Sequence, residues 1–185
     1  MVIGPDTSEI PKPEDFDEID ALLRDAFDGQ VEAERVRRLR AQGEMWWELA
    51  KRWEGVIAGY AALSRMRSPE GWACLCPVAV LPRFQHGAAA PDERAKRHYA
   101  FGARLVEEIA LVAKVDENLR PRGRNFPKTV VAIGKARFFE RAGFSLTRAQ
   151  GLTSPYTDMD TLIARPGDDV PRETLEFPAA FQALA

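Results

Sequence analysis

The chain has 185 residues, a length typical of one globular domain, and we expect residues 1–185 to fold as a single domain. Hydrophobic residues make up 45% and charged residues 29%, which is ordinary globular usage and excludes a disordered or low-complexity chain. The formal net charge of -2 provides no global positive field. The composition therefore disfavours both nucleic acid and an anionic membrane as partners.

The sequence also argues against secretion and membrane insertion. No apolar segment approaches the roughly 20 residues that a membrane-spanning helix needs, and residues 1–13 lack the basic and apolar pattern of a secretion signal. Cys74 and Cys76 are the two cysteines, and we expect them to point to opposite faces of a strand and to stay unpaired. These features predict a reduced, cytoplasmic protein.

The apolar pattern alternates between helical and strand-like spacing along the chain. Strands are predicted at residues 8–10, 45–52, 56–66, 72–81, 129–133 and 159–165. Helices are predicted from residue 13 to a stop at Gly29, from 31 to 42, through 105–112 and over 135–142. This alternation predicts an α/β or α+β domain in which helices lie on both sides of a mixed sheet.

Two parts of this pattern carry further expectations. Trp53-Glu54-Gly55 separates two strand-like runs and predicts a hairpin. Residues 72–81 are almost continuously apolar, which is typical of a strand in the middle of a sheet. Pro77 has no N–H for a strand ladder, so it indicates a bulge or a place where neighbouring strands part. Residues 85–96 are polar and alanine-rich, which predicts a surface excursion.

The arginines of residues 31–42 form a conspicuous basic group. Arg35, Arg37, Arg38 and Arg40 lie among glutamates, and a phosphate-binding patch is one interpretation of them. We favour a solvated helix face, because alternating charge of this kind is the ordinary pattern of an exposed helix.

The segment CPVAVLPRF ends an apolar strand, and further along RHYAFGARLVEE opens a helix with a small residue and a glycine. The start of such a helix presents unpaired backbone amides that can bind a pyrophosphate. A strand whose neighbour peels away can offer its backbone to an extended ligand arm. Many strand-turn-helix units bind no ligand, so this pattern alone does not decide between a binding site and a structural unit.

Three consecutive segments, VAVLPRF, RHYAFGARLVEE and VVAIGKARFFERAGF, resemble the signatures of the GNAT N-acetyltransferase superfamily. The tail segments SPY and FPAAF resemble its small YhbS-like bacterial branch. The resemblance runs from about residue 14 to residue 181. It implies a GNAT-like mixed central sheet flanked by helices, with a splayed strand pair that forms an acyl-CoA cleft. It further implies acetyl-CoA as acyl donor and a small-molecule or peptide amine as acceptor, and it leaves a homodimer open.

The resemblance assigns cofactor-binding residues to this chain. The backbone of Val78, Ala79 and Val80 would meet the pantetheine arm, and the pyrophosphate would lie at the helix start formed by Arg97, His98, Tyr99, Ala100, Phe101, Gly102 and Ala103. Ala100 stands where the family has its first glycine. A second register places the loop at residues 85–90 (QHGAAA) without an insertion, but alanine then replaces both glycines. We prefer the first register.

The usual acid and base of the family are missing at the matching positions. Phe139 stands where many members have a tyrosine that protonates the leaving thiolate, and Cys74 stands where the histone-modifying branch has a glutamate base. We therefore assign no catalytic residue and expect transfer by proximity and a polarised thioester. With Ala100, these departures also fit a non-catalytic module of this fold that binds CoA or another partner. A small α/β domain without a CoA site is a third alternative.

The remaining candidates are cysteines and aromatic residues. No metal site is expected, since His86 and His98 stand at no ligand spacing from the cysteines. Cys74 as an acyl acceptor stays open. Most tryptophans are expected in the core. The resemblance implies an acceptor groove between the first helices and the hairpin. One or two of the tryptophans and Tyr156 are candidates for it; the tryptophans are Trp46, Trp47, Trp53 and Trp72.

Overall fold

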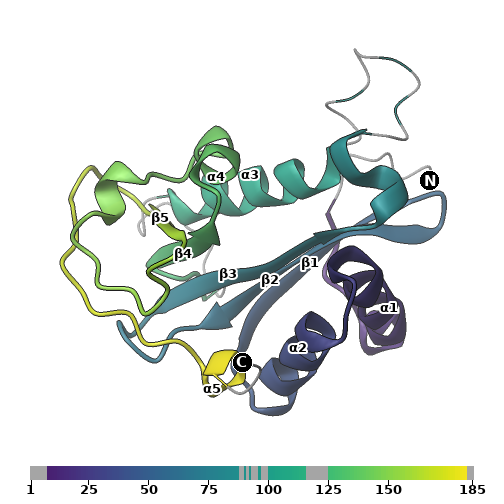
Figure 1. The fold of residues 1–185 in the computed structure, drawn as a ribbon, viewed down its shortest axis with the longest axis horizontal. Helices are drawn as coiled ribbons and strands as arrows, with labels where there is room; N and C mark the ends of the chain where they lie inside the picture. Colours follow the sequence, from purple (N-terminus) through teal and green to yellow (C-terminus); the bar gives the residue numbers. More distant parts are fainter. Residues whose placement is uncertain are drawn as a thin grey trace.

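The computed structural model describes residues 8–87, 90, 92, 96, 100–115 and 125–182. Its centre is a five-stranded sheet in the order β1-β2-β3-β4-β5 (Figure 1). The strands are β1 Met45–Trp53, β2 Val56–Arg65, β3 Trp72–Val80, β4 Thr129–Gly134 and β5 Asp160–Ala164. The β3–β4 pair is parallel and the other pairs are antiparallel. β3 lies in the middle of the sheet, as its continuous apolar run predicts.

Helices cover both faces of the sheet (Figure 1). They are α1 Phe16–Phe27, α2 Val31–Ala41, α3 Phe101–Ala113, α4 Ala136–Arg141 and α5 Ala179–Gln182, with shorter 3-10 turns η1 Pro13–Asp15, η2 Pro82–Gly87 and η5 Thr147–Ala149. On one face α1 and α2 pack against Tyr60 and Ala62 of β2, and on the other face α3 packs against Ala61 and Leu63. The alternation along β2 separates the two cores, and the predicted α/β (α+β) class is confirmed.

The predicted hairpin is present and its turn has the geometry that hairpins favour. Trp53 pairs with Val56, and the two residues between them, Glu54 and Gly55, have φ of 49° and 83°. Two positive φ angles define a turn whose twist matches that of the flanking strands. In contrast, the strand predicted at residues 8–10 reduces to a single bridge between Glu9 and Ala50.

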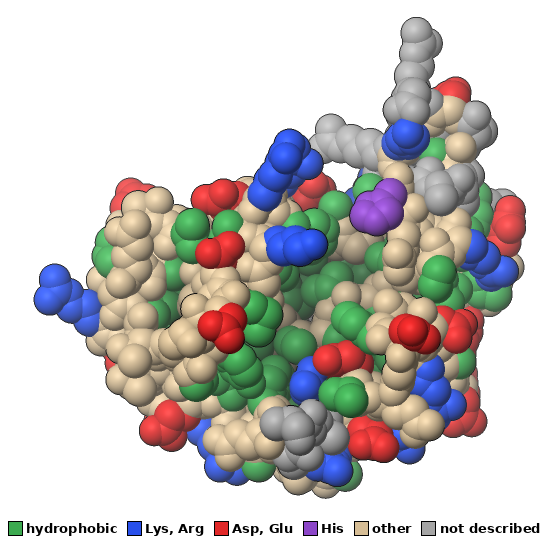
Figure 2. Space-filling view, in the orientation of Figure 1, with side chains coloured by type: hydrophobic (Ala, Val, Ile, Leu, Met, Phe, Trp, Pro, Cys, Tyr) green, Lys and Arg blue, Asp and Glu red, His purple; other side chains and the backbone are tan. Residues whose placement is uncertain are grey.

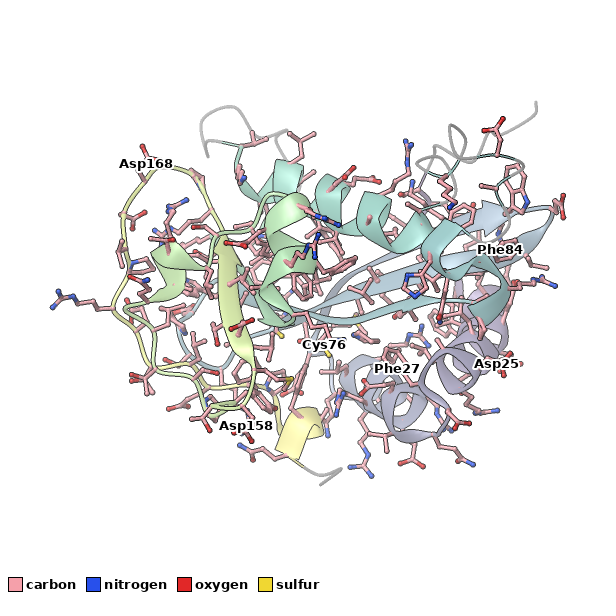
Figure 3. All side chains as sticks on the ribbon, turned by 45° about the horizontal axis from the view of Figure 1, so that its top comes forward. Asp25, Phe27, Cys76, Phe84, Asp158 and Asp168 are labelled. Carbon is pink, nitrogen blue, oxygen red and sulfur yellow. The ribbon has the colours of Figure 1, made fainter. Side chains whose placement is uncertain are left out.

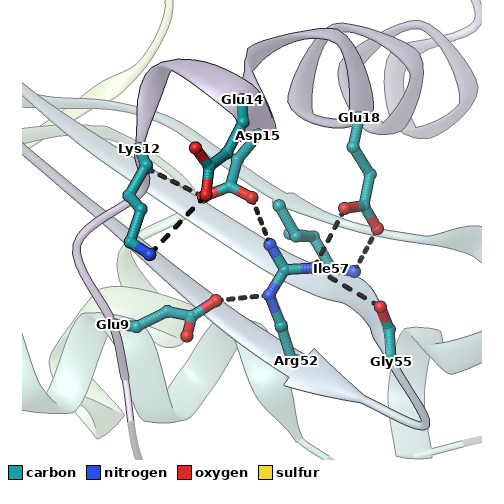
Figure 4. Close-up of polar contacts among 8 residues, drawn as sticks. All are labelled: Glu9, Lys12, Glu14, Asp15, Glu18, Arg52, Gly55 and Ile57. Atoms are coloured by element: carbon teal, nitrogen blue, oxygen red, sulfur yellow. Dashed lines mark hydrogen bonds and ion pairs between the residues drawn. The ribbon is translucent and has the colours of Figure 1, made fainter.

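Arg52 of β1 connects the first helical segment to this hairpin through hydrogen bonds (Figure 4). Arg52 donates to Glu9 at 2.5 Å, to Asp15 at 2.5 Å and to Glu18 at 3.0 Å. The second oxygen of Glu18 accepts the backbone N–H of Ile57 at 2.6 Å. The charge of one guanidinium therefore offsets three carboxylates that would otherwise repel one another.

The segment after β3 leads away from the sheet before the next helix begins. Residues 82–87 form η2, in which Phe84 is buried, and α3 starts only at Phe101. Residues 90, 92 and 96 lie outside any α-helix, as the predicted excursion requires, while residues 88–89, 91, 93–95 and 97–99 lie outside the described residues. Within the described part of the chain, no helix is long and apolar enough to cross a membrane.

Candidate active site

The central strands part halfway along their length. β3 and β4 pair over four residues, from Trp72 with Thr129 to Leu75 with Ala132. Beyond that last pair, β3 continues to Val80 and β4 continues to Gly134 without pairing with each other. The splayed strand pair that the resemblance implies is therefore present, and it is formed by β3 and β4.

A bulge in β3 stands where the strands part. Ala61 pairs with Val78 while Leu63 pairs with Leu75, so β3 carries one more residue than β2 between these two pairs. The extra length falls at Cys76 and Pro77, and Pro77 has no N–H to donate to a neighbour. A one-residue insertion also reverses which face the following side chains take. Val78 therefore packs in the same core as Leu75.

The space between the parted strands is a cleft of about 550 Å³. Figure 2 shows it as a hollow lined largely by hydrophobic side chains. Its residues come from α1 and the start of α2, from β3 and η2, from the start of α3, and from β4 and α4; they are Ala26, Phe27, Glu32, Leu75, Cys76, Pro77, Val78, Val80, Phe84, Gln85, His86, Ala100, Phe101, Gly102, Ala103, Ile133, Phe138 and Phe139.

The cleft brings together most of the residues that the sequence assigned to cofactor binding. Six of them line it: Val78, Val80, Ala100, Phe101, Gly102 and Ala103. Ala79 does not, because its side chain is buried against the core under α1 and α2. Arg97, His98 and Tyr99 lie outside the described residues.

The open edge of β3 can be read from its hydrogen bonds. Leu81 donates its N–H to Ala58 of β2 at 3.0 Å. Backbone groups alternate between the two edges of a strand, so those of Val78 and Val80 face away from β2, toward the cleft. The carbonyl of Val80 accepts a hydrogen bond from the Gln85 side chain at 3.0 Å.

The start of α3 packs closely on this edge of β3. A Cβ built on Gly102 would lie 3.0 Å from Cγ2 of Val80, so glycine allows the close approach. The first intrahelical bond runs from the N–H of Arg104 to the carbonyl of Ala100 at 3.0 Å. The N–H groups of Gly102 and Ala103 come before this bond and have no acceptor among the described residues of the helix, and both residues line the cleft. Gln85 and His86 of the second register also line it, but they belong to η2 and open no α-helix.

The cleft lining also includes a carboxylate that the sequence patterns did not indicate. Glu32 lines the cleft beside Cys76 and forms an ion pair with Arg35. The Arg35 guanidinium lies 5.1 Å from the ring centre of Phe181. The Arg35 side chain is 14% exposed. The Arg40 side chain, which pairs with Glu48, is 13% exposed. The interpretation of these two arginines as a solvated face is wrong.

The two cysteines differ in their access to the cleft. Both are unpaired, but Cys76 lines the cleft while Cys74 is fully buried outside it. They contribute to one hydrophobic cluster on one face of β3, so the expectation of opposite faces is wrong; residues two apart on a strand share a face. Burial and the nearby Glu32 raise the pKa of Cys76 to about 12, and burial holds the pKa of Cys74 well above its usual value. Both thiols are protonated near neutral pH, which disfavours Cys74 as an acyl acceptor.

Aromatic residues divide between the cleft and the core. Phe139 lines the cleft at 7% exposure, packed between Phe138 and Phe144. Tyr156 packs edge-on against Phe177 instead, and burial raises its pKa. None of the four tryptophans nor Tyr156 is among the described residues that line the cleft.

Solved structures of other proteins share this architecture. No family model matches the sequence, and no curated protein matches it. Among solved structures, the GNAT family N-acetyltransferase YhbS from Escherichia coli in complex with CoA is 24% identical, with a TM-score of 0.68 over 97% of this chain and 93% of that chain. The chain has the GNAT fold.

Two further structures share the GNAT fold. A GNAT family acetyltransferase from Brucella melitensis in complex with acetyl-CoA is 24% identical, with a TM-score of 0.66 over 95% of this chain and 97% of that chain. Aminoglycoside 6'-acetyltransferase type Ii is 15% identical, with a TM-score of 0.55 over 85% of this chain and 95% of that chain. The parted strands β3 and β4 therefore belong to a sheet with the GNAT fold.

Proposed function

We propose that residues 1–185 act as one acyltransferase domain that moves an acetyl group from acetyl-CoA to an amine in the cytoplasm. The observation that carries the proposal is the parting of β3 from β4 beyond Leu75 and Ala132, which leaves an open strand edge inside a cleft of about 550 Å³. Two solved structures of this fold hold CoA or acetyl-CoA. Both cysteines are unpaired, which fits a reducing compartment.

The pantetheine arm fits the open edge of β3. It is an extended chain with two amide groups, and a strand edge binds such a chain through backbone hydrogen bonds. The backbone groups of Val78 face the cleft, as does the N–H of Val80. The carbonyl of Val80 already accepts from Gln85, so the N–H groups and the Val78 carbonyl are the partners assigned to the arm.

The pyrophosphate fits the start of α3. The N–H groups of Gly102 and Ala103 precede the first intrahelical bond, and the positive end of the helix dipole favours an anion there. Gly102 lets this helix start lie close to Val80. The pyrophosphate and the pantetheine arm then occupy adjoining parts of one cleft, with the thioester near Cys76.

The chemistry assigned to the site is direct transfer. The amine nitrogen attacks the thioester carbonyl carbon, the C–S bond breaks, and an amide and the CoA thiolate form. The amine nitrogen loses one proton and the thiolate gains one. Phe139 has no proton to give, so water delivers it, and the fixed position of both reactants supplies the rate enhancement.

Titration and turnover test the proposal together. Acetyl-CoA is titrated into the protein by calorimetry, and a panel of amines is then assayed for release of free CoA thiol. One-to-one binding with turnover on at least one amine is expected. Binding without turnover on any amine supports the non-catalytic module instead, and an absence of binding overturns the proposal.

A further inference from the structure

Two aromatic side chains stand exposed inside the cleft. Phe27 at the end of α1 is 45% exposed and Phe138 in α4 is 38% exposed, and both line the cleft. α1 and α4 lie on opposite faces of the sheet (Figure 1), and Figure 3 labels Phe27 on α1. Large apolar side chains left open within a cleft are typical of contact with an apolar ligand.

The same end of the cleft has one acidic side chain among the described residues that line it. Glu32 uses Oε2 for the ion pair with Arg35, and its Oε1 has no hydrogen-bond partner within the described part of the chain. The ion pair and the Phe181 ring beneath the guanidinium hold the carboxylate in place. One oxygen of a fixed carboxylate is therefore open to a cation.

The position of Glu32 relative to the parted strands suits it to bind the acceptor amine. Glu32 lines the cleft together with Cys76, the first residue of β3 beyond the last β3–β4 pair. The proposed donor reaches this point from the other end, where α3 begins. An amine held at Glu32 thus lies on the opposite side of the thioester from the CoA moiety.

We propose that the acceptor is a primary amine with a single positive charge on an aromatic or branched aliphatic body. Phe27 and Phe138 contact the body, and Glu32 binds the ammonium group, which releases one proton to solvent before the neutral nitrogen attacks the thioester. A polycation finds no second carboxylate among the described lining residues, and an acceptor with a carboxylate beside its amine meets the charge of Glu32. This inference rests on the proposed transferase function.

Matched amines test the acceptor class. 2-Phenylethylamine is compared with phenylalanine, which adds one carboxylate, and with spermidine, which adds charges and lacks the aromatic body. The expected kcat/KM for 2-phenylethylamine exceeds that of each of the other two by at least about tenfold, the scale of one charge-assisted hydrogen bond. A kcat/KM for spermidine or phenylalanine equal to or above that of 2-phenylethylamine overturns the inference and leaves the transferase function standing.

Substitution of Glu32 tests whether this residue binds the acceptor. Glu32→Gln is expected to raise the KM for 2-phenylethylamine by about ten- to a hundredfold while the affinity for acetyl-CoA stays at the parental value. Glu34→Gln, on the same helix and outside the cleft lining, is the control and should match the parent. Glu32→Gln behaving like Glu34→Gln overturns the role of Glu32.

A second variant keeps the test valid if Glu32→Gln disturbs folding through its contact with Arg35. Phe27→Ala removes an exposed ring, so the fold should persist, and it should raise the KM for 2-phenylethylamine more than the KM for methylamine. An equal effect on both amines contradicts the aromatic contact. If the parent protein does not bind acetyl-CoA, the transferase function itself is contradicted. The calorimetric titration reports this outcome separately from the KM measurements.

Discussion

Leu75 and Ala132 form the last pair between β3 and β4, and the residues that follow them, Cys76 and Ile133, line a cleft instead of pairing with each other. The bulge at Cys76 and Pro77 coincides with this change. The parting places an open strand edge beside the start of α3. The candidate site therefore depends on one local irregularity in the middle of an otherwise regular sheet.

The amide of Gly102 is predicted to contribute directly to CoA affinity. Gly102→Pro removes this N–H from the start of α3, so the affinity for acetyl-CoA should fall by about ten- to a hundredfold, the equivalent of roughly 1.5 to 3 kcal/mol. Calorimetric titration measures the change, and circular dichroism confirms that the variant is folded.

Gly102→Ala is the matched control for that substitution. It keeps the N–H and adds a Cβ that would meet Val80 at 3.0 Å, so it reports the steric cost alone. It should weaken binding less than proline does. Parental affinity in a folded Gly102→Pro protein would mean that the pyrophosphate does not lie at this helix start.

Phe139→Tyr is predicted to leave turnover unchanged or to increase it. Phe139 lines the cleft, and a hydroxyl on its ring supplies a proton donor that the parent lacks. The kcat of both proteins with the best amine of the panel is the measurement. Phe139→Leu, which adds no donor, should not exceed the parent. A fall of more than tenfold in a folded Phe139→Tyr variant would contradict transfer without a side-chain acid.

Arg52 is predicted to stabilise the fold without touching the cleft. Arg52→Leu leaves Glu9, Asp15 and Glu18 facing one another without a cation, so the free energy of unfolding should fall by about 1 to 2 kcal/mol. Urea denaturation measures it. Arg141→Leu, at an exposed position of α4, should change it by less than about 0.5 kcal/mol. Equal effects from the two substitutions would show that the cluster in Figure 4 contributes nothing measurable.

Stability should fall at alkaline pH because of Cys76. The folded chain raises the pKa of this thiol from 9.0 to about 12, so the folded state keeps a proton that the unfolded state has lost. The contribution of the protonated Cys76 thiol to the free energy of unfolding is fully present below about pH 8. It is lost as the pH rises from about 9 toward 12, at up to about 1.4 kcal/mol per pH unit. Urea denaturation at pH 8, 9 and 10 shows the slope, which Cys76→Ala should reduce. An identical slope in that variant would exclude Cys76 as its source.

Local patterns were sufficient to predict the scaffold. The Glu54-Gly55 turn, the apolar run of β3 and the parting near Pro77 each depend on residues close together in the sequence. A helix start within residues 97–103 also follows from the small residues there, and α3 begins at Phe101. These features carry information in a window of a few residues, which is why sequence alone reveals them.

The acceptor end of the cleft was not predictable in the same way. Arg35 belongs to a helix with the charge pattern of a solvated surface, yet Phe181 from the far end of the chain covers its guanidinium. Phe27 fits the apolar stripe of α1, and its exposure arises only because the cleft opens beside it. Contacts between distant segments decide both roles, and no short pattern encodes them.

A crystal structure of the protein with acetyl-CoA tests the central claim most directly. The account predicts density for the pantetheine arm along the open edge of β3 at Val78 and Val80, the pyrophosphate at Gly102 and Ala103, and the thioester beside Cys76. Density for acetyl-CoA outside the space between β3 and β4, or a cleft left empty at saturating acetyl-CoA, would contradict it.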